Sequence, residues 1–172
     1  MKKKHGFCEI MTLFVMVLLL SGCNNSNKQS GDDLEIYYGN KKINIYDGDM
    51  SFAEMLKKED VNNLIYVSNN EEITITCNNK KTQKVQITEH ILNAEGEYKY
   101  KYEKEGKSID VTNKGNDYIF QIKPNVSTML SSNGEDYNLG EVIKGYHISI
   151  DNGKDKKNFC FAIRGDAAVL NR

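Results

Sequence analysis

Apolar and polar side chains alternate with a period of two along most of the chain from Leu34 onward, and Gly, Asn or Asp bounds each alternating run. A strand places successive side chains on opposite faces, so this period is typical of strands with one buried face. The pattern predicts a mainly antiparallel β domain. The expected strands are 34–38, 43–46, 64–68, 73–77, 84–91, 97–103, 107–112, 118–123, 146–151 and 158–164.

Local signals predict how these strands connect. Gly39-Asn40 and Asn152-Gly153 accept positive φ, which predicts turns between the first two strands and between the last two. Ser51-Phe52-Ala53-Glu54 has the form of a capping box and predicts one short helix that ends before Asn62. Residues 126–130 predict a single further helical turn.

Around ten short strands with one short helix favour a sandwich or barrel over a parallel α/β sheet. The segment from Gly115 to Phe120 resembles a late strand of the immunoglobulin fold, where a glycine turn leads to a tyrosine at a sheet corner. Two residues separate Gly115 from Tyr118 where that pattern has one, and the chain has no tryptophan. The resemblance implies an antiparallel immunoglobulin-like β-sandwich, which is the fold class we expect.

Residues 1–22 have the parts of a secretory signal peptide. The segment opens with Lys2, Lys3 and Lys4, and an apolar run follows over 10–20. That run is about a dozen residues long, whereas a membrane-spanning helix needs about 20. We therefore expect a cleaved signal and not a membrane-spanning anchor.

The apolar run ends in Leu20-Ser21-Gly22-Cys23, which resembles the lipobox of bacterial lipoproteins. The resemblance implies cleavage between Gly22 and Cys23 and a diacylglyceryl group on the Cys23 sulfur. Two acyl chains anchor a protein stably, whereas one binds reversibly. The alternative is an ordinary signal peptide beside an unrelated cysteine.

One proline and no tryptophan are typical of a low-GC Gram-positive coding bias, so we expect a lipid-anchored protein on the outer face of the plasma membrane.

The mature chain is expected to have two parts. Residues 23–33 are polar after the cysteine and predict a flexible tether, because they cannot bury enough surface to offset their ordering entropy. Residues 34–172 then form a single β-rich domain. The chain has 23 basic and 24 acidic residues; removing the signal with its three lysines and Glu9 leaves 20 against 23, a net charge of −3. This balance does not indicate nucleic-acid binding.

Cys77 and Cys160 are the cysteines that remain beside Cys23 in the mature chain. They are candidates for a disulfide, which would persist outside the cell. Their positions favour two separate thiols instead, because Cys77 alternates in phase with the apolar face of its strand and Cys160 alternates out of phase with its own.

Tyr98, Tyr100 and Tyr102 form a stripe that alternates with charged residues. An exposed stripe of this kind would be a binding surface for a sugar or peptide. The alternation favours the other interpretation, in which the three rings are the inward face of a half-buried strand.

Other motifs give weaker signals. Arg164-Gly165-Asp166 spells the tripeptide read by integrins, but a glycine after a final strand is also a plain terminator. His90 and His147 are 57 positions apart, with no cysteine or carboxylate at ligand spacing, which argues against zinc. No metal, cofactor or catalytic residue is predicted, since the mature sequence has no serine-nucleophile elbow, phosphate loop or metalloprotease helix.

The sequence leaves three function classes open. A tethered, non-catalytic module that binds an envelope protein, a peptide or a glycan is favoured, since it needs only what the chain shows. A protective lipoprotein, similar in size and layout to those that confer immunity to lantibiotics, is the first alternative, and an envelope enzyme with an unfamiliar site is the second. The segment 130–164, about a quarter of the chain, resembles the end of small Firmicute lipoproteins with Ig-like domains, whose function is mostly unassigned.

Overall fold

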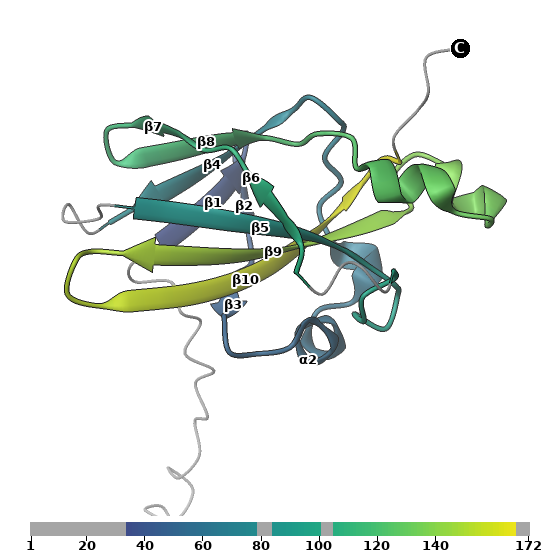
Figure 1. Ribbon diagram of the computed structural model, residues 1–172, viewed down its shortest axis with the longest axis horizontal. Helices are drawn as coiled ribbons and strands as arrows, with labels where there is room; N and C mark the ends of the chain where they lie inside the picture. The colour runs from purple at the N-terminus through teal and green to yellow at the C-terminus, as the bar shows by residue number, and fades with distance from the viewer. Residues whose placement is uncertain (1–33, 79–83, 101–104, 168–172) are drawn as a thin grey trace, which may run out of the picture.

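The computed structural model describes residues 34–78, 84–100 and 105–167. In these ranges the chain forms two antiparallel sheets of five strands each, which face each other as a β-sandwich (Figure 1). The predicted mainly β class is confirmed. The narrower assignment to an immunoglobulin-like topology stays a prediction.

The two sheets are named here by their strand order. Sheet A consists of β2 (Lys41–Ile43), β1 (Leu34–Tyr38), β4 (Glu72–Cys77), β8 (Asp117–Gln121) and β7 (Thr112–Lys114). Sheet B consists of β3 (Tyr46–Asp47), β10 (Lys156–Gly165), β9 (Val142–Asp151), β5 (Lys84–Leu92) and β6 (Lys107–Ile109). The long hairpin of β9 and β10 forms the middle of sheet B, with pairing that runs from Val142 and Gly165 to Asp151 and Lys156.

The main core lies between the two sheets and is filled from the inward positions of the alternating strands. Ile73 and Ile75 reach it from sheet A, and Tyr146, Ile148 and Phe161 reach it from sheet B. A shift of one residue in any of these strands would turn its whole apolar set outward. The period-two pattern therefore fixes which face of each strand is buried.

A second, smaller cluster covers the outer face of sheet B. It is formed by α2 (Phe52–Lys58), whose Phe52, Met55 and Leu56 are buried against residues of β9 and β10. The helix begins as predicted: Oγ of Ser51 accepts a hydrogen bond from the N–H of Glu54 at 3.2 Å, and the Glu54 carboxylate accepts one from the N–H of Ser51 at 3.1 Å. The expected capping box is confirmed.

The remaining helical segments are single turns of 3-10 helix. They are η1 (Val61–Asn63), η3 (Val126–Leu130) and η4 (Gly134–Tyr137). The predicted turn over 126–130 is η3, and η3 and η4 follow each other at one end of the sandwich (Figure 1). None of the helices in the described ranges is long and apolar enough to cross a bilayer.

Two predicted strands are divided between the sheets. The expected strand 43–46 joins the end of β2 in sheet A to the start of β3 in sheet B, and the expected strand 107–112 is split between β6 in sheet B and β7 in sheet A. Burial continues through the first crossing, since Ile43 and Ile45 both fill the main core. The alternation of apolar and polar residues therefore predicts which side chains are buried, but it does not predict which sheet the backbone joins.

Two further predicted strands were wrong. Of the expected strand 64–68, Tyr66 alone makes a bridge, to Arg164, because the buried Leu64 and Val67 stand three positions apart and do not alternate. Of the expected strand 97–103, the described part pairs through Tyr98 alone, to Leu92, and residues 101–103 lie outside the described ranges.

Candidate binding pocket

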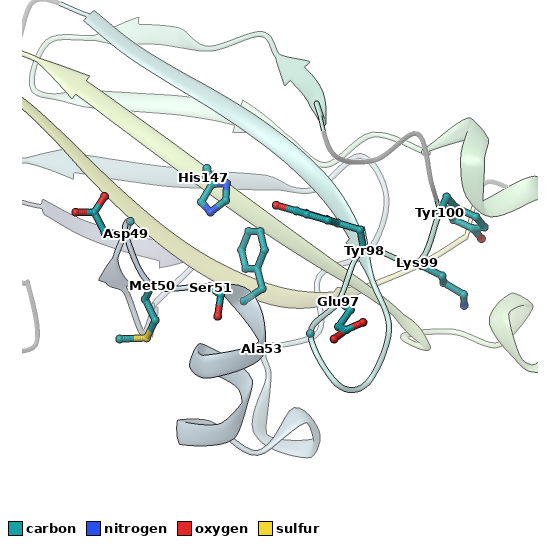
Figure 2. Close-up of a pocket in the computed structure, with 12 residues that line it drawn as sticks. Asp49, Met50, Ser51, Ala53, Glu97, Tyr98, Lys99, Tyr100 and His147 are labelled. Atoms are coloured by element: carbon teal, nitrogen blue, oxygen red, sulfur yellow. The ribbon is translucent and has the colours of Figure 1, made fainter.

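A pocket of about 750 Å³ opens on the outer face of sheet B, between the start of α2 and the loop that follows β5. This volume is in the range of small-ligand sites. Asp49 and Met50 precede α2 and lie on one side, while Glu97 and Tyr98 come from the loop on the other side (Figure 2). The Tyr98 side chain points across the opening toward His147 (Figure 2).

Phe52, Tyr98 and His147 line this pocket, and the buried ring of His90 packs against all three of them. The ring of Phe52 stacks on the imidazole of His147, with centroids 4.4 Å apart. His147 in turn lies 5.3 Å from His90, and Tyr98 covers His90 at 5.0 Å. Rings at these separations attract one another beyond their simple area burial. The buried rings of Phe52 and His90 thus hold His147 and Tyr98, which are partly exposed, in a preformed position at the pocket.

The strand register brings the two histidines together. Thr88 of β5 pairs with His147 of β9, and His90 pairs with Gly145, so His90 and His147 are diagonal neighbours on one face. Both alternate with core residues such as Tyr146, which places them on the outer face. Diagonal cross-strand neighbours are within reach of aromatic side chains.

Gly145 leaves the space that the ring of Phe52 occupies. A Cβ atom at this position would come within 2.8 Å of Cε1 of Phe52 and 2.7 Å of Cδ1 of Leu92. Real Cβ atoms do not approach neighbours so closely, so a side chain here would push the ring off the sheet. The glycine in the middle of β9 is therefore part of how the pocket floor is built.

The loop after β5 is held in place by its own hydrogen bonds. Oδ1 of Asn93 accepts from the N–H groups of Glu95 and Glu97, at 3.1 and 2.8 Å, which turns the chain back on itself. The N–H of Lys99 donates to the carbonyl of Ile91 at 2.9 Å. These bonds direct Tyr98 over the histidines, where 39% of its surface stays exposed.

The rim of the pocket carries an excess of negative charge. Lys99 forms an ion pair of 2.6 Å with Asp136 of η4, and the Asp136 carboxylate neutralises the positive charge of Lys99. Asp49 and Glu97 also line the pocket and are exposed, and neither is in an ion pair with a described residue. A carboxylate on each side of an aromatic floor favours a ligand with a positive group.

Burial tunes the acid–base behaviour of the floor. Desolvation lowers the pKa of His147 below its ordinary value, and the neighbouring His90 lowers it further. A neutral imidazole stacked on Phe52 is thus favoured at neutral pH. We find no group of three His, Cys, Asp or Glu side chains in the described ranges that could hold a metal ion.

The structure divides the predicted tyrosine stripe. Tyr98 and Tyr100 both line the pocket, while Tyr102 lies outside the described residues. The favoured inward orientation is wrong for Tyr98, which is partly exposed, whereas Tyr100 packs against a small cluster that includes Ile91. The physical reason is the turn at Asn93, which ends the strand before the stripe begins.

The two cysteines are not joined in a disulfide and lie in separate clusters. Cys77 faces the main core, and Cys160 faces α2 on the outer side of sheet B. Burial raises the pKa of Cys160 to about 12, so its thiol stays protonated and unreactive.

Asp166 of the Arg164-Gly165-Asp166 tripeptide is a structural side chain. It is 9% exposed, and its carboxylate accepts hydrogen bonds from the Tyr66 hydroxyl at 3.0 Å and the N–H of Gly140 at 3.0 Å. Arg164 donates to the carbonyl of Gly140 at 2.6 Å. These bonds tie the end of β10 to the loop before β9. Cys23, the predicted lipidation site, lies outside the described residues.

Sequence reasoning did not find Phe52, His90 and His147 as a group. The signal was present in the alternation, which puts both histidines opposite the core residues of their strands, but their meeting depends on the register of β5 with β9. No protein-family model matches the chain, and no curated protein and no solved structure is significantly similar to it.

Proposed function

We propose that the protein is a lipoprotein anchored to the outer face of the plasma membrane of a Gram-positive cell, in which a non-catalytic β-sandwich binds a cationic peptide segment. The lipobox ending in Cys23 supports the anchor, and the polar residues 24–33 support a tether. The observation that carries the binding role is the preformed aromatic pocket with two carboxylates at its rim.

The pocket suits a peptide that alternates apolar and basic side chains. Tyr98 and His147 offer partly exposed ring faces to an apolar group, and Asp49 and Glu97 offer partners to a lysine or arginine. A cation near aromatic rings contributes about 0.5–2 kcal/mol. Rings already in contact lose little entropy when a ligand arrives, which favours binding.

A protective role is the second candidate function. The same acidic rim favours cationic antimicrobial peptides, the class that lantibiotic-immunity lipoproteins intercept at the membrane. A tether that holds the domain close to the bilayer would place the pocket where such peptides arrive. Expression of the protein in a sensitive bacterium would then raise the concentration of peptide needed to stop growth, and Tyr98→Ala would remove that protection.

The binding proposal is tested by titration of the full-length chain in neutral detergent micelles. The probes are a synthetic leucine–lysine hexapeptide, its leucine–glutamate counterpart and a tetramer of N-acetylglucosamine, each followed by tyrosine fluorescence. We expect the lysine peptide to bind and the glutamate peptide to fail. Binding of the sugar alone would replace the peptide with a glycan, and no binding of any probe would count against this pocket as a peptide site.

Two variants with similar exposure locate the site. Tyr98→Ala removes the wall of the pocket and should weaken binding about tenfold, the effect of losing about 1.4 kcal/mol. Tyr137→Ala removes a ring that is 47% exposed and lies outside the pocket, so it should leave binding unchanged. Equal losses in both variants would show that the peptide binds elsewhere.

A further inference from the structure

A cluster of polar side chains is buried at one end of the main core, away from the pocket. Glu89 of β5 is 1% exposed, Lys144 of β9 is 0% exposed and Asn125, just before η3, is 4% exposed. Glu89 and Lys144 belong to sheet B, while Asn125 follows β8 of sheet A. The cluster therefore brings an amine, a carboxyl and a carboxamide from the two sheets together.

One carboxyl group contacts both of the others. Nδ2 of Asn125 donates to Oε1 of Glu89 at 2.9 Å, and Nζ of Lys144 lies 3.7 Å from Oε2 of the same residue. Tyr146 donates its hydroxyl to that Oε2 at 2.8 Å, which holds the carboxyl in position. Glu89 is thus hydrogen-bonded to the amide nitrogen and lies at ion-pair distance from the amine, which makes it the candidate proton carrier between the two.

Burial shifts Lys144 toward its neutral form, against the attraction of the Glu89 carboxyl. Nζ of Lys144 donates a hydrogen bond to the carbonyl oxygen of Lys123 at 2.8 Å, and its separation of 3.7 Å from Oε2 of Glu89 exceeds hydrogen-bond distance. An ammonium group needs three acceptors. Burial lowers the pKa of Lys144, and its stem packs on Gly165, where an added Cβ would lie 3.1 Å from Cδ. A buried neutral amine is a nucleophile.

The carboxamide of Asn125 is held in position as the electrophile that this amine would attack. Its Oδ1 accepts a hydrogen bond from the N–H of Ser127 at 3.0 Å, as the N-cap of η3. The same N–H would stabilise negative charge that develops on Oδ1 when the carboxamide carbon is attacked. Its Nδ2, the group that would leave, already contacts Glu89.

We propose that this cluster forms an intramolecular amide bond between Lys144 and Asn125. Nζ of Lys144 bonds to Cγ of Asn125, the Cγ–Nδ2 bond breaks, and Nδ2 leaves as ammonia. Glu89 takes one proton from Nζ and returns one to Nδ2, so it is unchanged at the end. The reaction needs no oxidant and no cofactor, and it joins the chain after sheet A to sheet B by a covalent bond.

Peptide mapping of the full-length chain tests the proposal directly. Trypsin with a glutamate-specific protease cuts between the two residues, after Glu135 and Glu141, and trypsin does not cut after an acylated lysine. We expect residues 115–135 and 142–154 to appear as one joined species that is lighter than the sum of the two peptides by one ammonia. The ordinary peptides alone, after prolonged incubation of the folded protein, would overturn the proposal.

Three substitutions identify the participants. Lys144→Met replaces the amine with an apolar chain of similar volume and should abolish the joined species. Glu89→Gln should slow or abolish it, because the proton carrier is lost. Asn125→Asp should still form the joined species, with loss of water in place of ammonia, since an acid replaces the amide.

The mapping also separates the cross-link from other ammonia losses. Asn152-Gly153 can lose ammonia by closing a ring on its own backbone, but that product joins no second peptide. Each variant is checked by circular dichroism, so a missing bond in an unfolded variant is not counted. A joined species that persists in folded Lys144→Met would overturn the assignment to Lys144.

Discussion

At the scale of single residues, space and desolvation shape the pocket more than hydrogen bonds do. Gly145 has no side chain, which lets the ring of Phe52 lie on β9, and His147 is stacked on that ring. The opposite placement of Cys77 and Cys160 follows from the phase of alternation in their strands, which the sequence displays. The contact of His90 with His147 does not, since it depends on the register of β5 with β9, which pairs Thr88 with His147.

Gly145→Ala should destabilise the domain, because its Cβ would overlap the ring of Phe52 and the Leu92 side chain. Overpacking of this kind costs typically about 1–3 kcal/mol. Gly134→Ala is the matched control, since a Cβ there has open space and it should shift the free energy of unfolding by under about 0.5 kcal/mol. Urea unfolding measures both, and equal values for the two variants would contradict the packing argument.

His147 should make the stability depend on pH. Its folded pKa is lowered, so the unfolded chain binds a proton that the folded protein resists. The stabilisation is complete above the ordinary histidine pKa of about 6.5 and is lost as the pH falls through the folded value. His147→Phe keeps a ring on Phe52 and should lose less melting temperature between about pH 7 and pH 5. Parallel losses in both proteins would exclude this role.

At the scale of elements, the pocket depends on one short helix and one loop. The capping box positions the start of the helix, and the hydrogen bonds of Asn93 position the start of the loop. The helix was predictable because a capping box is a local signal. The loop was not, since the charge alternation of 97–100 matches a strand, whereas the side chain of Asn93 and the positive φ of Gly96 turn the backbone away. The two crossings between sheets escaped prediction because the burial period continues through them.

Ser51→Ala should weaken α2 and with it the position of Phe52. Loss of an N-cap hydroxyl costs about 1 kcal/mol, which lowers the melting temperature by roughly 4 °C in a domain of this size. Lys57→Ala, an exposed change in the same helix, should have almost no effect. The measurement is thermal unfolding, and a Ser51→Ala protein as stable as Lys57→Ala would mean that the capping box does not hold the helix.

At the scale of the whole molecule, the described part of the chain is one β-sandwich that begins at Leu34. Residues 24–33 before it carry no apolar side chain that a core could bury. The fragment 33–172 should therefore fold alone, with a β-type circular dichroism spectrum and one cooperative melt. A spectrum dominated by helix, or a melt without cooperativity, would contradict the boundary at residue 33.

The account as a whole depends on the claim that Cys23 carries the lipid that places this domain at the cell surface. Metabolic labelling with an acyl-chain probe in a Gram-positive host, followed by gel analysis of wild type and Cys23→Ala, tests it most directly. We predict label on the wild-type protein and none on Cys23→Ala, which should remain an uncleaved precursor. Label that persists on Cys23→Ala, or a wild-type protein without label, would contradict the account.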